Sequence, residues 1–109
     1  MKKTNHQSEG ALPPAAESGV LQEFARLRMI LSETHSEIPS LLAQERRIGH
    51  ELGLAEGRGE NSDVMRAQLE DVGRQRQAAV RRREAGIQSV LELEGALQAE
   101  RASAEAARQ

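Results

Sequence analysis

The sequence contains no cysteine and only one aromatic residue, and both shortages restrict what the protein can be. Without cysteine there is no disulfide, no thiolate nucleophile and no cysteine-ligated zinc or iron–sulfur site. Phe24 is the single aromatic side chain, whereas a globular core with a deep ligand pocket usually draws on several. The apolar residues are therefore better suited to a thin seam than to a rounded core.

The sequence also lacks long apolar runs. No stretch approaches the roughly 18 apolar residues that a membrane-spanning helix needs. Lys2 and Lys3 are not followed by the apolar segment of a signal peptide. The 109 residues leave room for one small domain. We therefore expect a soluble protein, cytoplasmic by default, that has no membrane partner and no small-molecule substrate.

A heptad pattern runs through residues 20–55, where seam positions recur at alternating steps of four and three. These positions are Val20, Phe24, Leu27, Leu31, Thr34, Ile38, Leu41, Glu45, Ile48, Leu52 and Ala55. Such spacing is typical of a helix with a narrow apolar stripe, which is stable only when a second helix covers the stripe. The pattern therefore predicts a first helical arm over residues 19–56 that packs against a partner helix.

Pro39 interrupts this first arm. A helix that continues through it loses the hydrogen bond to the carbonyl of His35, at a cost of about 3 kcal/mol. Two interpretations stay open. The arm is one kinked helix that keeps its heptad phase, which the unbroken spacing favours, or it is two helices with Ser36 capping the second.

The remaining boundaries follow from turn residues and composition. Residues 1–18 are polar and contain Pro13-Pro14, so we expect a disordered leader, with Ser18 as N-cap of the first arm. Residues 57–62 form the predicted turn, with Gly57 in the left-handed conformation and Asn61 or Ser62 as the next N-cap. A second arm is expected over residues 63–107, which lack proline and are rich in good helix formers.

The second arm carries a poorer stripe. Its apolar members in phase are Met65, Leu69, Val72, Ala79, Val90, Leu93 and Leu97. Arg76, Arg83 and Gly86 occupy stripe positions, while Val80 and Ile87 lie beside them. We therefore expect the stripe to shift phase near Arg83, as a stutter would allow.

The two arms are expected to pair with each other as an antiparallel hairpin. Residues 19–56 sum to −2 and residues 57–84 to +2, which favours pairing within the chain. The expected ion pairs are Arg26–Glu94, Arg28–Glu92, Glu37 with Arg82 or Arg83, Glu45 with Arg74 or Arg76, and Arg47 with Glu70 or Asp71. The expected apolar pairs are Leu31 with Ile87 or Val90, Phe24 with Leu97, and Ile48 with Val72 or Leu69.

The fold class predicted from these patterns is all-α, a coiled-coil-like hairpin. A lone hairpin with so thin a core is only marginally stable, because burial of each seam leucine contributes about 1.5 to 3 kcal/mol against the ordering of every backbone residue. Leu21, Ile30, Leu42 and Leu54 widen the apolar face of the first arm. We therefore expect a dimer that forms a four-helix bundle, or a complex with another helical protein.

The sequence offers little chemistry for catalysis or metal binding. His6, His35 and His50 lack the spacing of a metal site, so neither a metal nor a cofactor is predicted. Glu33 and Glu37 lie on one helix face without an apolar wall and are expected to be solvated. The leading hypothesis is a non-enzymatic protein-interaction module. Its expected partner-binding residues are Phe24, Leu27, Leu31, Ile38, Leu41 and Ile48.

The alternative hypothesis is a helical dimer that binds nucleic acid through a basic segment. The residues concerned are Arg74, Arg76, Arg81, Arg82 and Arg83. Such a helix could lie along phosphates. However, the segment has no aromatic side chain to stack on bases, and three consecutive arginines point in directions about 100° apart. We therefore expect these arginines mainly to pair with acidic residues of the first arm.

Overall fold

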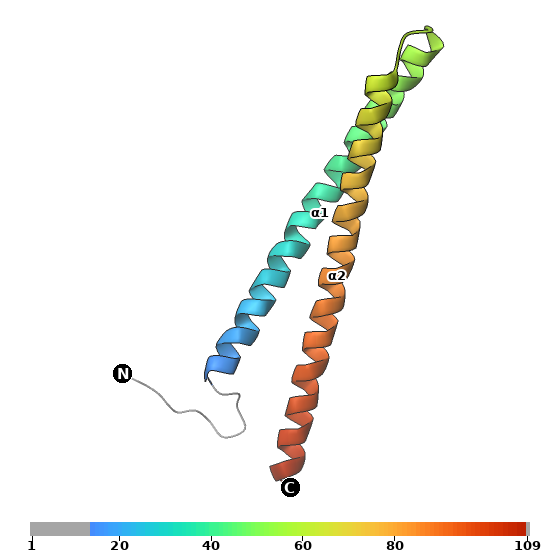
Figure 1. Ribbon diagram of the computed structural model, residues 1–109. Coiled ribbons are helices and arrows are strands. Elements are labelled where there is room, and N and C mark those ends of the chain that lie inside the picture. The colour runs from blue at the N-terminus through green and yellow to red at the C-terminus, as the bar shows by residue number, and fades with distance from the viewer. Residues whose placement is uncertain (1–13, 109) are drawn as a thin grey trace.

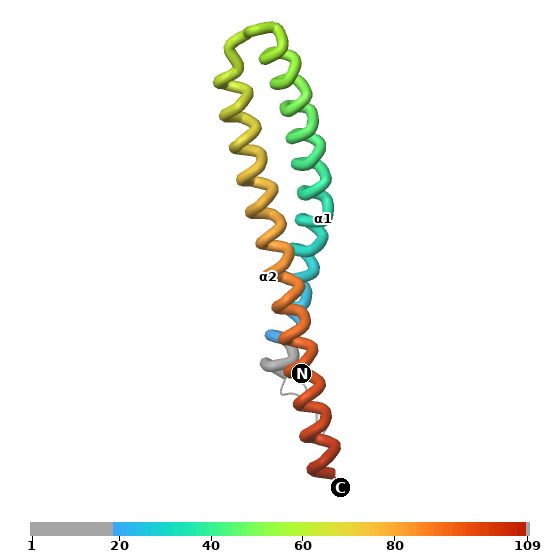
Figure 2. The backbone as a smooth tube through the Cα atoms, turned by 90° about the vertical axis from the view of Figure 1, so that its right-hand side faces the viewer, coloured from blue at the N-terminus to red at the C-terminus, as the bar shows by residue number. Residues whose placement is uncertain are grey.

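The computed structural model describes residues 14–108, and these form two helices joined by a short turn. Helix α1 spans Pro14–Gly57 and helix α2 spans Asp63–Arg108. The helices pack against each other in antiparallel orientation and make an elongated hairpin of 77 × 32 × 15 Å (Figure 1). Seen from the side, α2 extends beyond the start of α1 at the open end (Figure 2). The predicted all-helical hairpin is confirmed.

The first arm is one helix. Helix α1 contains Pro39 in its interior and continues through it, so the two-helix alternative does not apply to this segment. The helix begins at Pro14, four residues before the N-cap expected at Ser18. Proline suits a first helical turn, because its nitrogen carries no hydrogen that would lack a partner there. The rest of the expected leader, residues 1–13, lies outside the described residues.

The turn is built on a left-handed glycine, but that glycine is Gly59 and not Gly57 as predicted. Gly59 has a φ angle of 72°. Its N–H donates to the carbonyl of Glu56 at 3.1 Å, and the N–H of Glu60 donates to the carbonyl of Ala55 at 2.9 Å. These two bonds form a Schellman motif, which satisfies the last carbonyls of α1. At the start of α2, the Asn61 side chain accepts the N–H of Asp63 at 3.0 Å.

The core is a single seam between the helices, and its spacing confirms the heptad pattern of the first arm. On α1, buried residues recur every seven positions at Leu27, Thr34 and Leu41, and the other stripe positions are buried or half-buried. On α2, buried residues also recur every seven positions, at Val72, Ala79 and Gly86. Leu41 packs with Val72 and Ala79, and Ile38 and Ile48 pack against this cluster.

The predicted phase shift near Arg83 is wrong, because the stripe of α2 keeps its phase through both arginines. Arg76 and Arg83 are half-buried in the seam, whereas Ile87 is 39% exposed. An arginine can lie in an apolar seam because its aliphatic stem packs while the guanidinium reaches a partner. Arg76 Nε lies 2.6 Å from Glu45 Oε2, and Arg83 Nη1 donates to the Leu31 carbonyl at 3.4 Å.

The middle of the seam combines a polar residue with a glycine. The fully buried Thr34 donates its hydroxyl to the carbonyl of Ile30 at 2.8 Å, so the hydroxyl is satisfied within its own helix. A Cβ atom at Gly86 would lie 3.4 Å from both Ile30 Cγ2 and Leu31 Cδ2. Gly86 therefore packs directly against these two residues of α1, at a distance where a Cβ atom would make van der Waals contact with both.

Replacement of Gly53 by alanine is expected to stabilise the hairpin. Gly53 is exposed inside α1, and a Cβ atom there would meet nothing within 4 Å. Alanine lowers the free energy of a helix interior by about 1 kcal/mol relative to glycine. Thermal unfolding followed by circular dichroism should show a higher melting temperature for Gly53→Ala. An unchanged or lower melting temperature would contradict the helix seen at this position.

Candidate interaction surface

The six residues predicted to bind a partner lie in the seam between the two helices of the same chain. Leu27 and Leu41 are buried, and Ile38 and Ile48 pack on the core cluster. Leu31 and Phe24 are half-buried: the Leu31 side chain lies against Gly86, and Phe24 lies nearer the open end. The apolar surface of these residues therefore serves mainly to hold α1 on α2.

The arginines of the basic segment are largely engaged with groups of the same chain. Arg82 forms ion pairs with Glu33 and, at 3.8 Å, with Glu37. Arg74 lies 3.5 Å from Asp71 within its own helix. The hydrogen bond to the Glu45 carboxylate raises the pKa of the Arg76 guanidinium. Arg83 donates to a backbone carbonyl, so Arg81 alone of the five has no such partner among the side chains of residues 19–108.

The ion pairs test the register expected from the sequence. Glu37–Arg82 and Glu45–Arg76 are confirmed, so the antiparallel register is as predicted in the middle of the hairpin. The pairs expected for Arg26, Arg28 and Arg47 do not occur within the described part of the chain. Arg26 instead binds Glu23 at 2.7 Å, because a carboxylate one turn away on the same helix is closer than one on α2.

The hairpin has two different sides flanking the seam. One side, which we call the charged side, carries Glu33, Glu37 and Arg82, and on it α1 and α2 are linked by ion pairs. The opposite side begins with one row of residues on each helix. On α1, each member directly follows a position of the seven-residue series that contains Leu27, Thr34 and Leu41. On α2, each member directly follows a position of the series that contains Val72, Ala79 and Gly86. These are residues 21, 28, 35, 42, 49 and 56 on α1 and residues 66, 73, 80, 87, 94 and 101 on α2. The Glu56–Arg66 ion pair joins these two rows at the turn, so both rows lie on one side of the hairpin.

This opposite side carries apolar residues that neither helix covers, and we call it the apolar side. In addition to the rows above, it includes the next residues around each helix, at 25, 32, 39, 46 and 53 on α1 and at 70, 77, 84, 91 and 98 on α2. Its exposed apolar residues are Leu21 (67%), Leu42 (36%), Ile87 (39%) and Leu91 (56%), with the half-buried Val80 between them. Large apolar side chains grouped on one side typically mark a surface for another protein.

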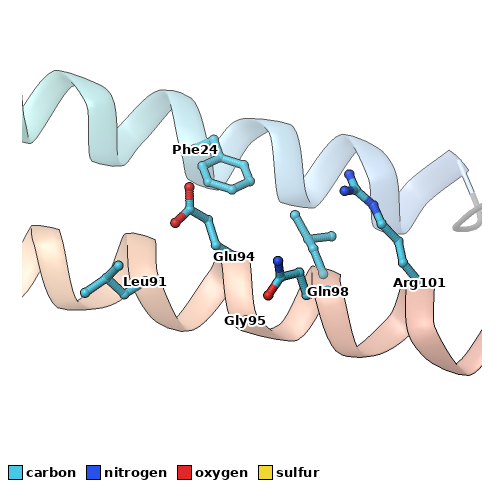
Figure 3. Close-up of a pocket in the computed structure, with 7 residues that line it drawn as sticks. Phe24, Leu91, Glu94, Gly95, Gln98 and Arg101 are labelled. Atoms are coloured by element: carbon cyan, nitrogen blue, oxygen red, sulfur yellow. The ribbon is translucent and has the colours of Figure 1, made fainter.

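Toward the open end, the apolar side continues into a groove between the helices. The groove has a volume of about 620 Å³ and is lined by Phe24, Leu91, Glu94, Gly95, Leu97, Gln98 and Arg101. In Figure 3 the Phe24 ring and the Glu94 carboxylate lie between the two ribbons, and Arg101 extends from α2 toward α1. Phe24 and Leu97, expected to face each other, both line this groove.

Leu91 belongs to this surface but was not singled out from the sequence, unlike Val80 and Ile87. The signal that could have found it is its position one turn after Ile87 on the same side of α2. A correct phase for the second stripe is needed before that side can be assigned. Because the phase of the α2 stripe was predicted incorrectly, Leu91 was not assigned to the exposed surface.

Residues 19–108, whose side chains the structure describes, contain neither a metal-binding cluster nor a membrane-spanning segment. No group of three or more histidine, aspartate and glutamate side chains in this range is arranged to hold a metal ion. His35 and His50 are exposed on α1, and His6 lies outside the range. Neither α1 nor α2 combines the length and the apolar character that a bilayer-crossing helix requires.

The fold and its surface define the class of this molecule as an antiparallel two-helix hairpin with a heptad-spaced seam. Four of its exposed large apolar residues lie on the apolar side, whereas Met29, Leu54 and Val64 are exposed elsewhere. Comparisons with known protein families, with characterised proteins and with solved structures find no match to the chain.

Proposed function

We propose that the protein is a non-enzymatic protein-association module that dimerises into a four-helix bundle. The observation that carries this proposal is the apolar side, where Leu21, Leu42, Ile87 and Leu91 remain exposed after α1 and α2 have paired. Full burial of such a side chain contributes about 1.5 to 3 kcal/mol. A partner that covers them would add this free energy to the small contribution of the thin two-helix core. A different helical protein could supply the same cover, and it is the alternative partner.

The proposal includes a bend of α1 at Pro39, which lies on the apolar side. Its ring removes one hydrogen bond of the helix, and sharp bends in helices usually occur at such positions. A bend there would let α1 follow the curvature of a second hairpin. In this proposal the bend improves the fit of α1 to the partner, while the heptad contacts between α1 and α2 continue on both sides of Pro39.

Molar mass in solution tests the proposal directly. Light scattering across a dilution series should give twice the chain mass of 12.0 kDa, with concentration read by refractive index because the chain has no tryptophan or tyrosine. A mass of one chain at every concentration would contradict self-association. A pull-down with the hairpin as bait would then identify the alternative helical partner.

Binding of nucleic acid through the basic segment is the less favoured function. Four of its five arginines bind groups of the same chain, namely Glu33, Glu37, Glu45, Asp71 and a backbone carbonyl, and Arg81 is the exception. We expect no retardation of DNA or RNA by the protein at low salt, where phosphate contacts are strongest. We also expect Arg82→Ala to change the free energy of unfolding by less than about 1 kcal/mol, because both of its ion pairs are exposed. Salt-sensitive retardation that Arg82→Ala abolishes would reverse this ranking.

A further inference from the structure

We propose that the occupant of the apolar side is a second copy of this chain, placed so that α1 of each copy lies on α2 of the other and both turns lie at the same end. This inference rests on the proposed association function and adds an orientation to it. It is carried by the charges that accompany the exposed apolar residues.

The two helices present opposite charges on the apolar side. Between residues 21 and 53 of α1, the charged residues on this side are Arg28 and Arg46. Between residues 70 and 98 of α2, they are Glu70, Glu84 and Glu94. All five are exposed, and none forms an ion pair with any residue from 19 to 108, the range whose side chains are described. Over these two ranges, α1 therefore offers only basic residues and α2 only acidic residues to a partner. Outside them, Glu56 and Arg66 pair with each other at the turn, and Arg101 lies on α2 in the groove at the open end.

The levels of these charges along the hairpin also agree. Glu37 and Arg82 form an ion pair and therefore lie at the same level of the hairpin. Because the helices are antiparallel, nine residues toward the turn bring Arg46 level with residue 73, and nine residues toward the open end bring Arg28 level with residue 91. Glu70 and Glu94 each lie three residues from those levels, which is about 4.5 Å along a helix axis. A two-fold axis along the hairpin keeps the levels equal in both copies. It places α1 of one copy on α2 of the other, with opposite charges within one turn.

The inverted arrangement fails on the same charges. If the turns lay at opposite ends, α1 would face α1 and α2 would face α2 of the second copy. The α1 helices would then bring Arg28 and Arg46 of the two copies together. The α2 helices would likewise bring Glu70, Glu84 and Glu94 together. Apposed like charges oppose association, so the arrangement with the turns at the same end is selected.

A distance between the two turns distinguishes these arrangements. The chain has no cysteine, so Glu60→Cys provides one attachment site for a spin label in the exposed turn. For turns at the same end, pulsed electron spin resonance should give about 20 to 30 Å, since bundled helices lie about 8 to 10 Å apart and each label adds its tether. Inverted copies would give a distance close to the 77 Å length of the hairpin and would overturn the orientation alone. A single-chain mass of the labelled protein in light scattering, together with no short distance, would overturn the association function itself.

Charge reversal with mixing tests the contact between copies. Arg46→Glu and Glu70→Arg should each weaken dimerisation, by about tenfold for a close charge pair. Mixing the two variants should restore dimers, because each contact between copies then joins opposite charges, whereas positions 46 and 70 carry the same charge in a dimer of either variant alone. Failure of the mixture to restore dimers would overturn the proposed pairing.

The matched controls for this test are the neighbouring residues. Arg47→Glu and Asp71→Arg make the same changes of charge one position further along each helix. That step turns the side chain by about 100°, away from the apolar side. These variants should leave the dimer dissociation constant within twofold of its original value. An equal weakening by the controls would mean that net charge, and not pairing on the apolar side, sets the affinity.

Discussion

Leu41→Asp is expected to abolish the helical hairpin. Leu41 is 6% exposed and packs with Val72 and Ala79 in the core cluster. Removing a buried leucine costs about 2 to 5 kcal/mol, and burying an unpaired carboxylate costs several kcal/mol more. Together these losses rival the 5 to 15 kcal/mol that typically separates a small folded domain from its unfolded chain. Circular dichroism at 222 nm should show the loss of most helical signal at 25 °C.

The matched control is Leu42→Asp, which introduces the same side chain at the next position. Leu42 is 36% exposed on the apolar side, so its aspartate can remain in water. At high protein concentration we expect this variant to keep its helices but to dimerise more weakly. A variant at position 41 that remains fully helical would show that the seam does not hold the hairpin together. Equal unfolding by both variants would show that the fold depends on the apolar side as strongly as on the seam.

Pro39→Ala is expected to stabilise the hairpin strongly. Pro39 lies inside α1 and is exposed, so alanine removes no buried contact. The substitution restores an N–H that can donate to the carbonyl of His35 and removes the ring clash, a gain of about 3 kcal/mol. For a domain of this size that gain raises the melting temperature by roughly 10 °C or more.

Ser40→Ala is the control for this substitution. It changes an exposed position of the same helix turn without touching the hydrogen-bond ladder, and it should shift the melting temperature by only a few degrees. A melting temperature for Pro39→Ala no higher than that of Ser40→Ala would show that the ring costs the helix little. If Pro39→Ala is more stable but dimerises less well, the bend serves the partner, as proposed.

The hairpin could be predicted because the first stripe is apolar almost throughout and the turn is rich in glycine. Leu27, Thr34, Leu41, Ile48 and Ala55 recur every seven residues, and such a spacing has few interpretations other than a paired helix. The left-handed residue of the turn was misassigned because Gly57 and Gly59 both tolerate positive φ. Only the hydrogen bonds from Gly59 and Glu60 identify the one that adopts it.

The second stripe and the interaction surface were harder to predict, for one shared reason. Arg76, Arg83 and Gly86 are not apolar, so a pattern based on apolar side chains reads them as interruptions. In the hairpin, Glu45 partners Arg76, and Gly86 packs against Ile30 and Leu31. Both effects depend on the opposite helix and cannot be seen within one segment. An error in the phase of the α2 stripe also causes an error in predicting which residues of α2 lie on the exposed apolar side.

The turn at Gly59 also bears on the order in which the hairpin closes. Every contact between α1 and α2 joins residues whose separation in sequence grows steadily from the turn to the open end. Contacts beside the turn close short loops, and each closed layer shortens the loop that the next layer must close. We therefore expect the two helices to pair progressively from the turn toward the open end. Pairing would start where the Schellman motif and the Glu56–Arg66 ion pair hold the end of α1 beside the start of α2. The groove beside Phe24 is therefore expected to form last.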